Sequence, residues 1–87
     1  MSAKKILIVD DSPTELKLIT DVFNTPEYEV VTAEDGEAGV ATAMAEKPEL
    51  IILDVVMPKM NGFQACRKIK SAPELENIPV ILLTSKN

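Results

Sequence analysis

Soft metal ligands and cross-linking residues are nearly missing from this sequence. Its 87 residues contain one cysteine and no histidine. A disulfide framework and a zinc site built from cysteine and histidine are therefore excluded within one chain. We interpret the single thiol, Cys66, as a small core residue of a protein in a reducing cytoplasm.

Long hydrophobic runs and basic charge are also scarce. No stretch approaches the ~20 apolar residues of a membrane span, and the apolar run that begins at Ile6 ends too soon, at Asp10, for a signal peptide. Nine basic residues stand against 14 acidic ones, for a net charge of −5, and only those at positions 67–70 cluster. We therefore expect neither a membrane nor a nucleic acid as a direct partner.

The chain has only three glycines and no glycine-rich loop that would cradle a phosphate. For this reason a flavodoxin-like cofactor binder is set aside. The apolar content of 46% and the charged content of 26% are those of an ordinary globular protein. At this length we expect a single domain over residues 1–87.

Strands and helices alternate along the sequence, which predicts an α/β fold with a parallel sheet. Two of the expected strands are continuous apolar runs, as in strands covered on both faces, whereas Tyr28–Ala33 is more polar and is expected at an edge. The predicted strands are Ile6–Val9, Tyr28–Ala33, Leu50–Leu53 and Pro79–Thr84. The predicted helices run from about Pro13 to Asn24, from Asp35 to Glu46 and from Gly62 to Ser71.

Capping signals and apolar spacing support these helices. Ser12 and Glu15 form a predicted capping box around a proline at the first helical position. Asp35 and Asn61 are expected to cap the next two helices. The side chains expected at helical spacing on the inward faces are Leu16, Ile19, Val22 and Phe23, then Ala38, Ala41, Met44 and Ala45, then Phe63, Cys66 and Ile69.

Four polar residues follow the predicted strands: Asp10 and Asp11 after the first, Asp54 after the third, and Thr84 at the end of the fourth. In an open parallel sheet, ligands bind beyond the carboxyl ends of the strands. Two carboxylates on neighbouring strands, roughly 5 Å apart, repel by about 3 kcal/mol at an effective dielectric constant of 20. A divalent cation such as Mg²⁺ relieves that repulsion, because hard cations prefer oxygen ligands.

The grouping suggests phosphoryl transfer. A carboxylate such as Asp54 can act as a nucleophile and form an aspartyl-phosphate, a reaction that needs neutralised charge more than an acid or base. Asp10 and Asp11 would hold Mg²⁺, Thr84 would donate its hydroxyl to a phosphoryl oxygen, and the Val56 carbonyl would lie beside the metal. Taken singly, each aspartate also fits a turn or cap, the threonine a structural role, and the 54–62 segment a plain strand-to-helix loop.

With these residues, the chain resembles the receiver domain of bacterial two-component response regulators, the CheY-like group. The matching stretches are Ile6–Ser12, Asp54 with Met57-Pro58 and Gly62, Pro79–Ile81, and Thr84-Ser85. The resemblance covers the whole chain and implies a flavodoxin-like open parallel sheet with strand order 2-1-3-4. The strings at 12–15 and 56–65 are similar to single-domain receivers of twitching-motility and chemosensory systems.

The resemblance also implies roles. Asp54 is the implied phosphoacceptor, Asp10 and Asp11 are the acidic Mg²⁺ ligands, Val56 is a carbonyl ligand and Thr84 is the switch hydroxyl. The implied partner is a sensor histidine kinase or a phosphotransfer protein. The family's fourth helix, fifth strand and fifth helix have no counterpart in these 87 residues, nor does its fifth-strand lysine, a role we do not assign to Lys86.

This difference from the family predicts association. The strand at Val80–Leu83 would be an unpaired apolar edge, which can pair with another chain, and part of one sheet face would stay uncovered. We therefore expect a homo-oligomer formed through this strand, either a symmetric dimer or an exchanged segment.

Three functions are compared. The first is a cytoplasmic phosphoacceptor receiver, which is not an enzyme. The second, an aspartyl-phosphate phosphohydrolase, is set aside because such enzymes usually carry an acid two residues beyond the nucleophile, where this chain has Val56. The third is an interaction or assembly module that is not phosphorylated. Loss of Mg²⁺ binding on Asp11→Ala would favour the first over the third.

Overall fold

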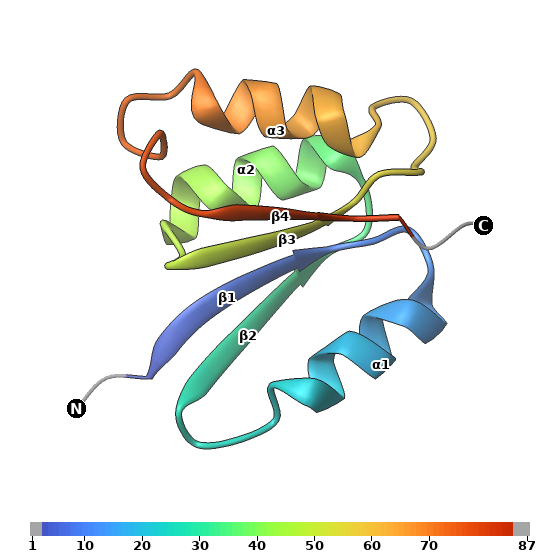
Figure 1. Cartoon of the computed structure of the whole chain (residues 1–87), viewed down its shortest axis with the longest axis vertical. Helices are drawn as coiled ribbons and strands as arrows, with labels where there is room; N and C mark the ends of the chain where they lie inside the picture. Colours follow the sequence, from blue (N-terminus) through green and yellow to red (C-terminus); the bar gives the residue numbers. More distant parts are fainter. Residues whose placement is uncertain (1–2, 85–87) are drawn as a thin grey trace.

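The fold is an open parallel sheet with helices on both faces (Figure 1). A computed structural model describes residues 3–84. The order of elements is β1 (Lys4–Val9), α1 (Pro13–Val22), β2 (Tyr28–Ala33), α2 (Gly36–Glu46), β3 (Leu50–Asp54), α3 (Gly62–Lys70) and β4 (Val80–Leu83). The four strands lie in the order β2-β1-β3-β4, and every pair is parallel. The predicted flavodoxin-like architecture, its 2-1-3-4 order and the edge position of β2 are therefore confirmed.

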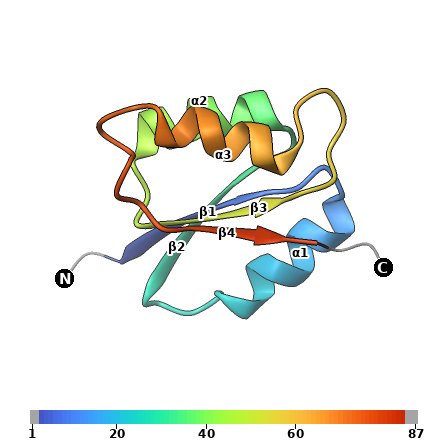
Figure 2. The ribbon, with the colours of Figure 1, turned by 45° about the horizontal axis from the view of Figure 1, so that its top comes forward.

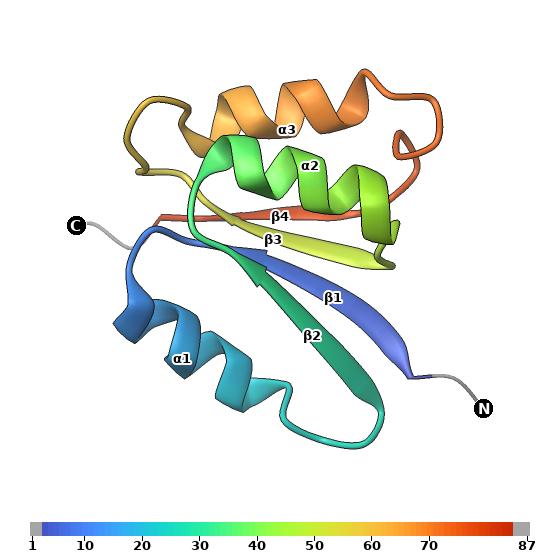
Figure 3. The same cartoon turned by 180° about the vertical axis from the view of Figure 1, so that it is seen from behind.

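Helices divide unequally between the two faces of the sheet. Among the elements of residues 3–84, α1 is the one helix on its face of the sheet, while α2 and α3 lie side by side on the other, as the tilted view in Figure 2 and the view from behind in Figure 3 make clear. This division creates two hydrophobic cores, one on each face. The face that carries α1 is the less completely covered of the two, since Ile81 of β4 is 46% exposed there, away from the α1 core.

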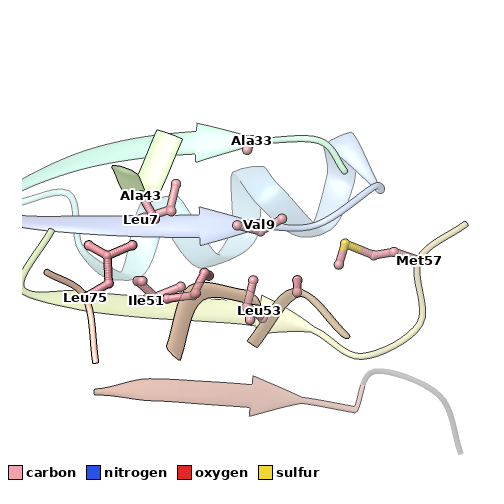
Figure 4. Close-up of a cluster of buried hydrophobic side chains, with 10 residues drawn as sticks. Leu7, Val9, Ala33, Ala43, Ile51, Leu53, Met57 and Leu75 are labelled. Atoms are coloured by element: carbon pink, nitrogen blue, oxygen red, sulfur yellow. The ribbon is translucent and has the colours of Figure 1, made fainter. Parts of the chain in front are cut away.

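The central strands supply both cores by alternation. Leu7 and Val9 of β1, with Ile51 and Leu53 of β3, point toward α2 and α3 (Figure 4). Their strand neighbours Ile6, Ile8 and Ile52 point toward α1. Successive strand residues face opposite sides, so a strand covered on both faces must be apolar at every position. The two continuous apolar runs in the sequence have this physical cause.

The inward face of α2 differs from the predicted one. Ala41 and Ala45 are exposed and Met44 is 43% exposed, while the buried residues are Gly36, Gly39 and Ala43. The reason is close packing: a Cβ atom on Gly39 would lie 2.8 Å from Cγ2 of Val9. The helix lies against β1 through the positions that lack bulk, so its larger methionine is turned outward.

Two further inward assignments were wrong. Val22 of α1 is 71% exposed, although Leu16 is buried and Ile19 and Phe23 pack against the α1 core as predicted. Phe63 of α3 is 55% exposed. Helix α3 instead buries Ala65 and Ile69 and half-buries Cys66, because these lie on the face that meets the sheet.

None of the helices within residues 3–84 combines the length and the apolar character needed to cross a membrane.

Candidate functional site at the carboxyl edge of the sheet

Asp10 and Asp54 meet at the carboxyl edge of the two central strands. Asp54 is the last residue of β3, and Asp10 directly follows β1, whose Val9 pairs with Leu53. Both side chains are almost fully buried, with exposed fractions of 2% and 3%. One carboxylate oxygen from each, with one from Glu15, lie within 4.8 Å of one another. The sequence predicted the meeting of the two aspartates but not the third member of this group.

Backbone amides fix both buried carboxylates. The Ser12 N–H donates to Asp10 Oδ1 at 2.9 Å, and the Val56 N–H donates to Asp54 Oδ1 at 3.3 Å. In each case the donor is two residues farther along the chain, which is an Asx-type turn. The same hydrogen bonds that turn the chain out of the strand therefore also orient the carboxylate.

Glu15 comes to this site from the first turn of α1. The predicted capping box is only half formed: the Glu15 N–H donates to Ser12 Oγ at 3.3 Å. The Glu15 carboxyl lies with Asp10 and Asp54, whereas the complete capping box belongs to α3, between Asn61 and Gln64. The sequence signal was ambiguous, because an acid at the third helical position fits a cap as well as a site beside the preceding aspartates.

The other predicted site residues lie around this group rather than in it. Asp11 is exposed and is not among the three grouped carboxylates. Val56 is 47% exposed and touches Asp54 through its N–H. Thr84 is exposed and follows Leu83, the register partner of Asp54. Ser85 and Lys86 lie outside the described residues.

The loop after β3 is held close to the sheet. The Val55 N–H donates to the Leu83 carbonyl at 2.9 Å, and the Gly62 N–H donates to the Val55 carbonyl at 2.9 Å. A Cβ atom on Gly62 would overlap the backbone carbonyl oxygen of Asp54. A glycine is therefore required where α3 begins, because the helix start and the end of β3 share almost the same space.

Burial and charge act together on Asp10. Burial is the largest cause that raises its pKa, to about 7 from an ordinary value of 3.8, and the hydrogen bond from the Ser12 N–H opposes it. The hydrogen bond to Glu15 and the charges of Asp54 and Glu15 raise the pKa further. A carboxylate in this position is costly to ionise unless positive charge is supplied.

The donor set fits a divalent cation. Three carboxylates offer oxygen atoms at mutual distances that one ion can span, and oxygen donors of this kind are those that hard cations prefer. Bound positive charge would also favour ionised Asp10, against the effect of burial.

A parallel α/β sheet that gathers buried carboxylates at its carboxyl edge has the architecture of a domain that binds a ligand at that edge. The chain belongs to the response regulator receiver domain family, whose model matches residues 6–87. It is therefore a phosphoacceptor module of two-component signalling, and the predicted family membership is confirmed.

Individual relatives agree with this assignment. The chain is 47% identical over 83 residues to the protein PilH of Pseudomonas aeruginosa. The aligned region covers 95% of this chain and 69% of PilH. It is 45% identical over 85 residues to the response regulator PleD of Caulobacter vibrioides, covering 98% of this chain but 18% of PleD. The chain thus spans most of one relative and a small part of another.

Solved structures share the fold closely. The chemotaxis protein CheY4 of Vibrio cholerae superimposes with a TM-score of 0.90 at 32% identity, covering 98% of this chain and 71% of that one. The receiver domain of the sensor histidine kinase PA1611 of Pseudomonas aeruginosa gives a TM-score of 0.89 at 27% identity, covering 97% and 69%. That structure holds a magnesium ion in its active-site cleft.

Proposed function

We propose that Asp54 accepts a phosphoryl group from a histidine of a sensor kinase or phosphotransfer protein, in the presence of Mg²⁺. The observation that carries this proposal is the position of the Asp54 carboxylate, buried at the end of a central strand and grouped with Asp10 and Glu15. A nucleophile held in one orientation loses little freedom on reaction. The half-buried single thiol, Cys66, is compatible with the cytoplasmic location that we include in this proposal.

Transfer of the phosphoryl group forms one bond and breaks one bond, and needs no further reactant. An oxygen of the Asp54 carboxylate forms the new bond to phosphorus as the bond between phosphorus and the donor's imidazole nitrogen breaks. The electron pair of that bond stays on the imidazole nitrogen, which is then available to take up a proton. No acid or base side chain at the site is needed for this exchange.

The proposed Mg²⁺ ligands are the carboxylates of Asp10, Asp11 and Asp54 and the backbone carbonyl of Val56. When bound, the ion supplies positive charge opposite the carboxylates and the phosphoryl oxygens. Asp11 is adjacent in sequence to the buried Asp10 and is exposed. Glu15, the third carboxylate of the group, contacts Asp10 and raises its pKa, and its oxygen lies within reach of the same ion.

Thr84 is the proposed switch residue. Its neighbour Leu83 is paired with Asp54 across the sheet, and the Leu83 carbonyl accepts from the Val55 N–H. Phosphorylation brings about −2 units of charge and acceptor oxygens to this edge. The Thr84 hydroxyl would donate to one of those oxygens and draw the end of β4 toward the site.

The nucleophile is tested with a small phosphodonor such as radiolabelled acetyl phosphate. We expect Asp54→Asn to abolish the label that hydroxylamine releases, as it does from an acyl phosphate, and Asp21→Asn, which changes an exposed aspartate on α1, to leave it unchanged. Label retained by Asp54→Asn would overturn the nucleophile assignment. A Mg²⁺ titration of Asp11→Ala tests the ligand set, with weakened binding as the expected result.

We also propose that the chain forms a homo-oligomer through β4. Within residues 3–84 this strand pairs only with β3, and its side chains Ile81 and Leu83 are 46% and 36% exposed. An apolar strand edge of this kind favours pairing with a second copy. The same surface would serve a receiver that assembles without being phosphorylated. Solution mass measured with and without Mg²⁺ and beryllofluoride, a mimic of the phosphoryl group, distinguishes this module from a phosphoacceptor. Only a phosphoacceptor changes its solution mass when beryllofluoride is added.

A further inference from the structure

A groove with basic walls runs along the exposed side of α3 and the end of the loop that precedes this helix. Its volume is about 360 Å³, and it is lined by Lys59, Met60, Gln64, Arg67, Lys68 and Ser71. The last four follow the i, i+3, i+4, i+7 spacing of one helical stripe. This stripe is the face of α3 opposite the buried Ala65 and Ile69, so no part of the described chain covers it.

The cations in this groove differ from most others in the protein. Lys5, Lys17 and Lys47 form ion pairs with acids of the chain. Lys70 donates to the backbone carbonyls of residues 76 and 78. Within residues 3–84, the basic side chains without such a partner are Lys4, Lys59, Arg67 and Lys68, and three of these four line the groove.

Stabilisation of α3 by positive charge explains only some of the cations that line the groove. Arg67 and Lys68 lie in the last turn of α3, where positive charge is favourable to the helix dipole. Lys59 and Met60 precede the helix and gain nothing from that effect. Lys59 also has a left-handed backbone, with φ of 69°, which is uncommon for a residue other than glycine.

We propose that this groove binds an acidic segment of a partner protein, with carboxylates against Arg67 and Lys68 and an apolar side chain against Met60. Charge complementarity carries the choice of partner, because the cations gather on one face of a chain whose net charge is −5. Lys59 also lines a smaller hollow with Asp35 and Glu37. Those acids repel carboxylates at that end, so the acidic residues of the partner lie toward the end of α3.

Other occupants fit less well. A nucleic acid needs several phosphate contacts, and this groove offers three cations on a chain whose net charge is −5. Met60 and the aliphatic stems of the cationic side chains also give the groove apolar surface, which suits one apolar side chain within an acidic segment.

The test uses the whole chain and a defined probe. The probe is a short synthetic helical peptide with glutamates at i, i+3 and i+4 and one leucine, compared with the same peptide carrying glutamine for glutamate. We expect amide NMR shifts confined to residues 59–71, and a dissociation constant that rises with ionic strength. The doubly substituted Arg67→Glu, Lys68→Glu chain should bind about tenfold more weakly, since each exposed ion pair contributes modestly.

Two matched variants separate binding from folding. Lys4→Glu reverses an unpaired exposed lysine outside the groove and should leave binding nearly unchanged. Lys59→Gly removes a groove cation at a left-handed position that glycine adopts readily, so it should weaken binding without loss of thermal stability. Equal binding of the glutamine peptide, equal weakening by Lys4→Glu, or tighter binding of a short DNA duplex to the same residues would each overturn the proposal.

Discussion

At the scale of single residues, the acidic site is a compromise between folding and function. Asp10 is 2% exposed and lies beside two other carboxylates, an arrangement that disfavours its charged form. Hydrogen bonds from backbone amides hold Asp10 and Asp54 in place. The protein thus keeps a carboxylate cluster that lowers its stability at neutral pH, because the same cluster is what attracts a cation.

The first prediction concerns pH. Because the pKa of Asp10 is raised from 3.8 to about 7, the folded chain binds its proton more tightly than the unfolded chain does. Between those values the folded state holds more protons, so this contribution to stability falls as pH rises and is fully present only below about pH 4. Without divalent metal, urea unfolding at pH 5 and pH 8 should show a larger loss for the native sequence than for Asp10→Asn. The same pH dependence in both proteins would contradict this account.

The second prediction concerns Glu15. Its hydrogen bond and its charge both raise the pKa of Asp10, so Glu15→Gln should lower that pKa below about 7. Carboxyl carbon NMR across a pH titration reports the midpoint directly. Glu49→Gln, which changes an exposed glutamate at the amino end of β3, is the control and should leave the Asp10 midpoint in place. An unmoved midpoint in Glu15→Gln would show that Glu15 does not contribute to the raised pKa of Asp10.

At the scale of elements, the site is built from strand ends and helix starts. β1 and β3 end together because they are paired in register, Val9 with Leu53. The first turns of α1 and α3 lie close to these strand ends. Helix α1 places Glu15 beside the aspartates, and α3 begins at Gly62, which contacts the end of β3. Backbone hydrogen bonds hold the loop after β3 at its two ends, at Val55 and at Gly62. The aspartate carboxylates are therefore held in fixed positions relative to the sheet.

The third prediction tests the close approach at α3. In Gly62→Ala the new methyl group meets the backbone of Asp54, which cannot rotate away, so we expect a loss of about 1–3 kcal/mol in the free energy of unfolding and weaker Mg²⁺ binding. Gly39→Ala is the comparison, because its methyl group meets the Val9 side chain at 2.8 Å. It should lower stability while changing Mg²⁺ affinity less. Chemical denaturation and metal titration of both variants make the check.

At the scale of the whole molecule, coverage of the sheet is uneven. In the described residues 3–84, α2 and α3 cover one face and α1 covers part of the other (Figure 2). β4 lies at the edge with alternating exposure, Val80 and Leu82 packed against the α2–α3 core and Ile81 and Leu83 turned outward. Within residues 3–84, β4 pairs with β3 alone and turns apolar side chains outward, two features that promote strand pairing between chains.

The fourth prediction concerns that edge. Ile81→Lys places a charge on an outward-facing position of β4 and should shift the chain toward monomer, because a charged edge side chain opposes pairing. Val22→Lys introduces the same charge on α1, at a position 71% exposed, and should leave the mass distribution unchanged. Analytical ultracentrifugation at micromolar concentration distinguishes them. A native chain that is already a well-folded monomer would refute association through β4.

The sequence predicted the sheet and the aspartate pair well, and the helix faces poorly. Strands covered on both faces need apolar residues throughout, a signal that Ile6–Val9 and Leu50–Leu53 carry without ambiguity. In α2, by contrast, nearly every residue is small or apolar, so the inward direction cannot be read from hydrophobicity. The burial of Gly39 in place of Met44 depends on how closely the helix approaches Val9.

What the sequence determined by itself was local: which segments are strands, where each ends, and that acids follow two of them. Hydrophobic pattern and capping residues carry that information, because they act over a few residues. Only the tertiary structure decided that Glu15 joins Asp10 and Asp54, and that three cations with no ion-pair partner in residues 3–84 share one groove. Such meetings depend on the rotation of a helix about its axis and its distance from the sheet, which packing sets.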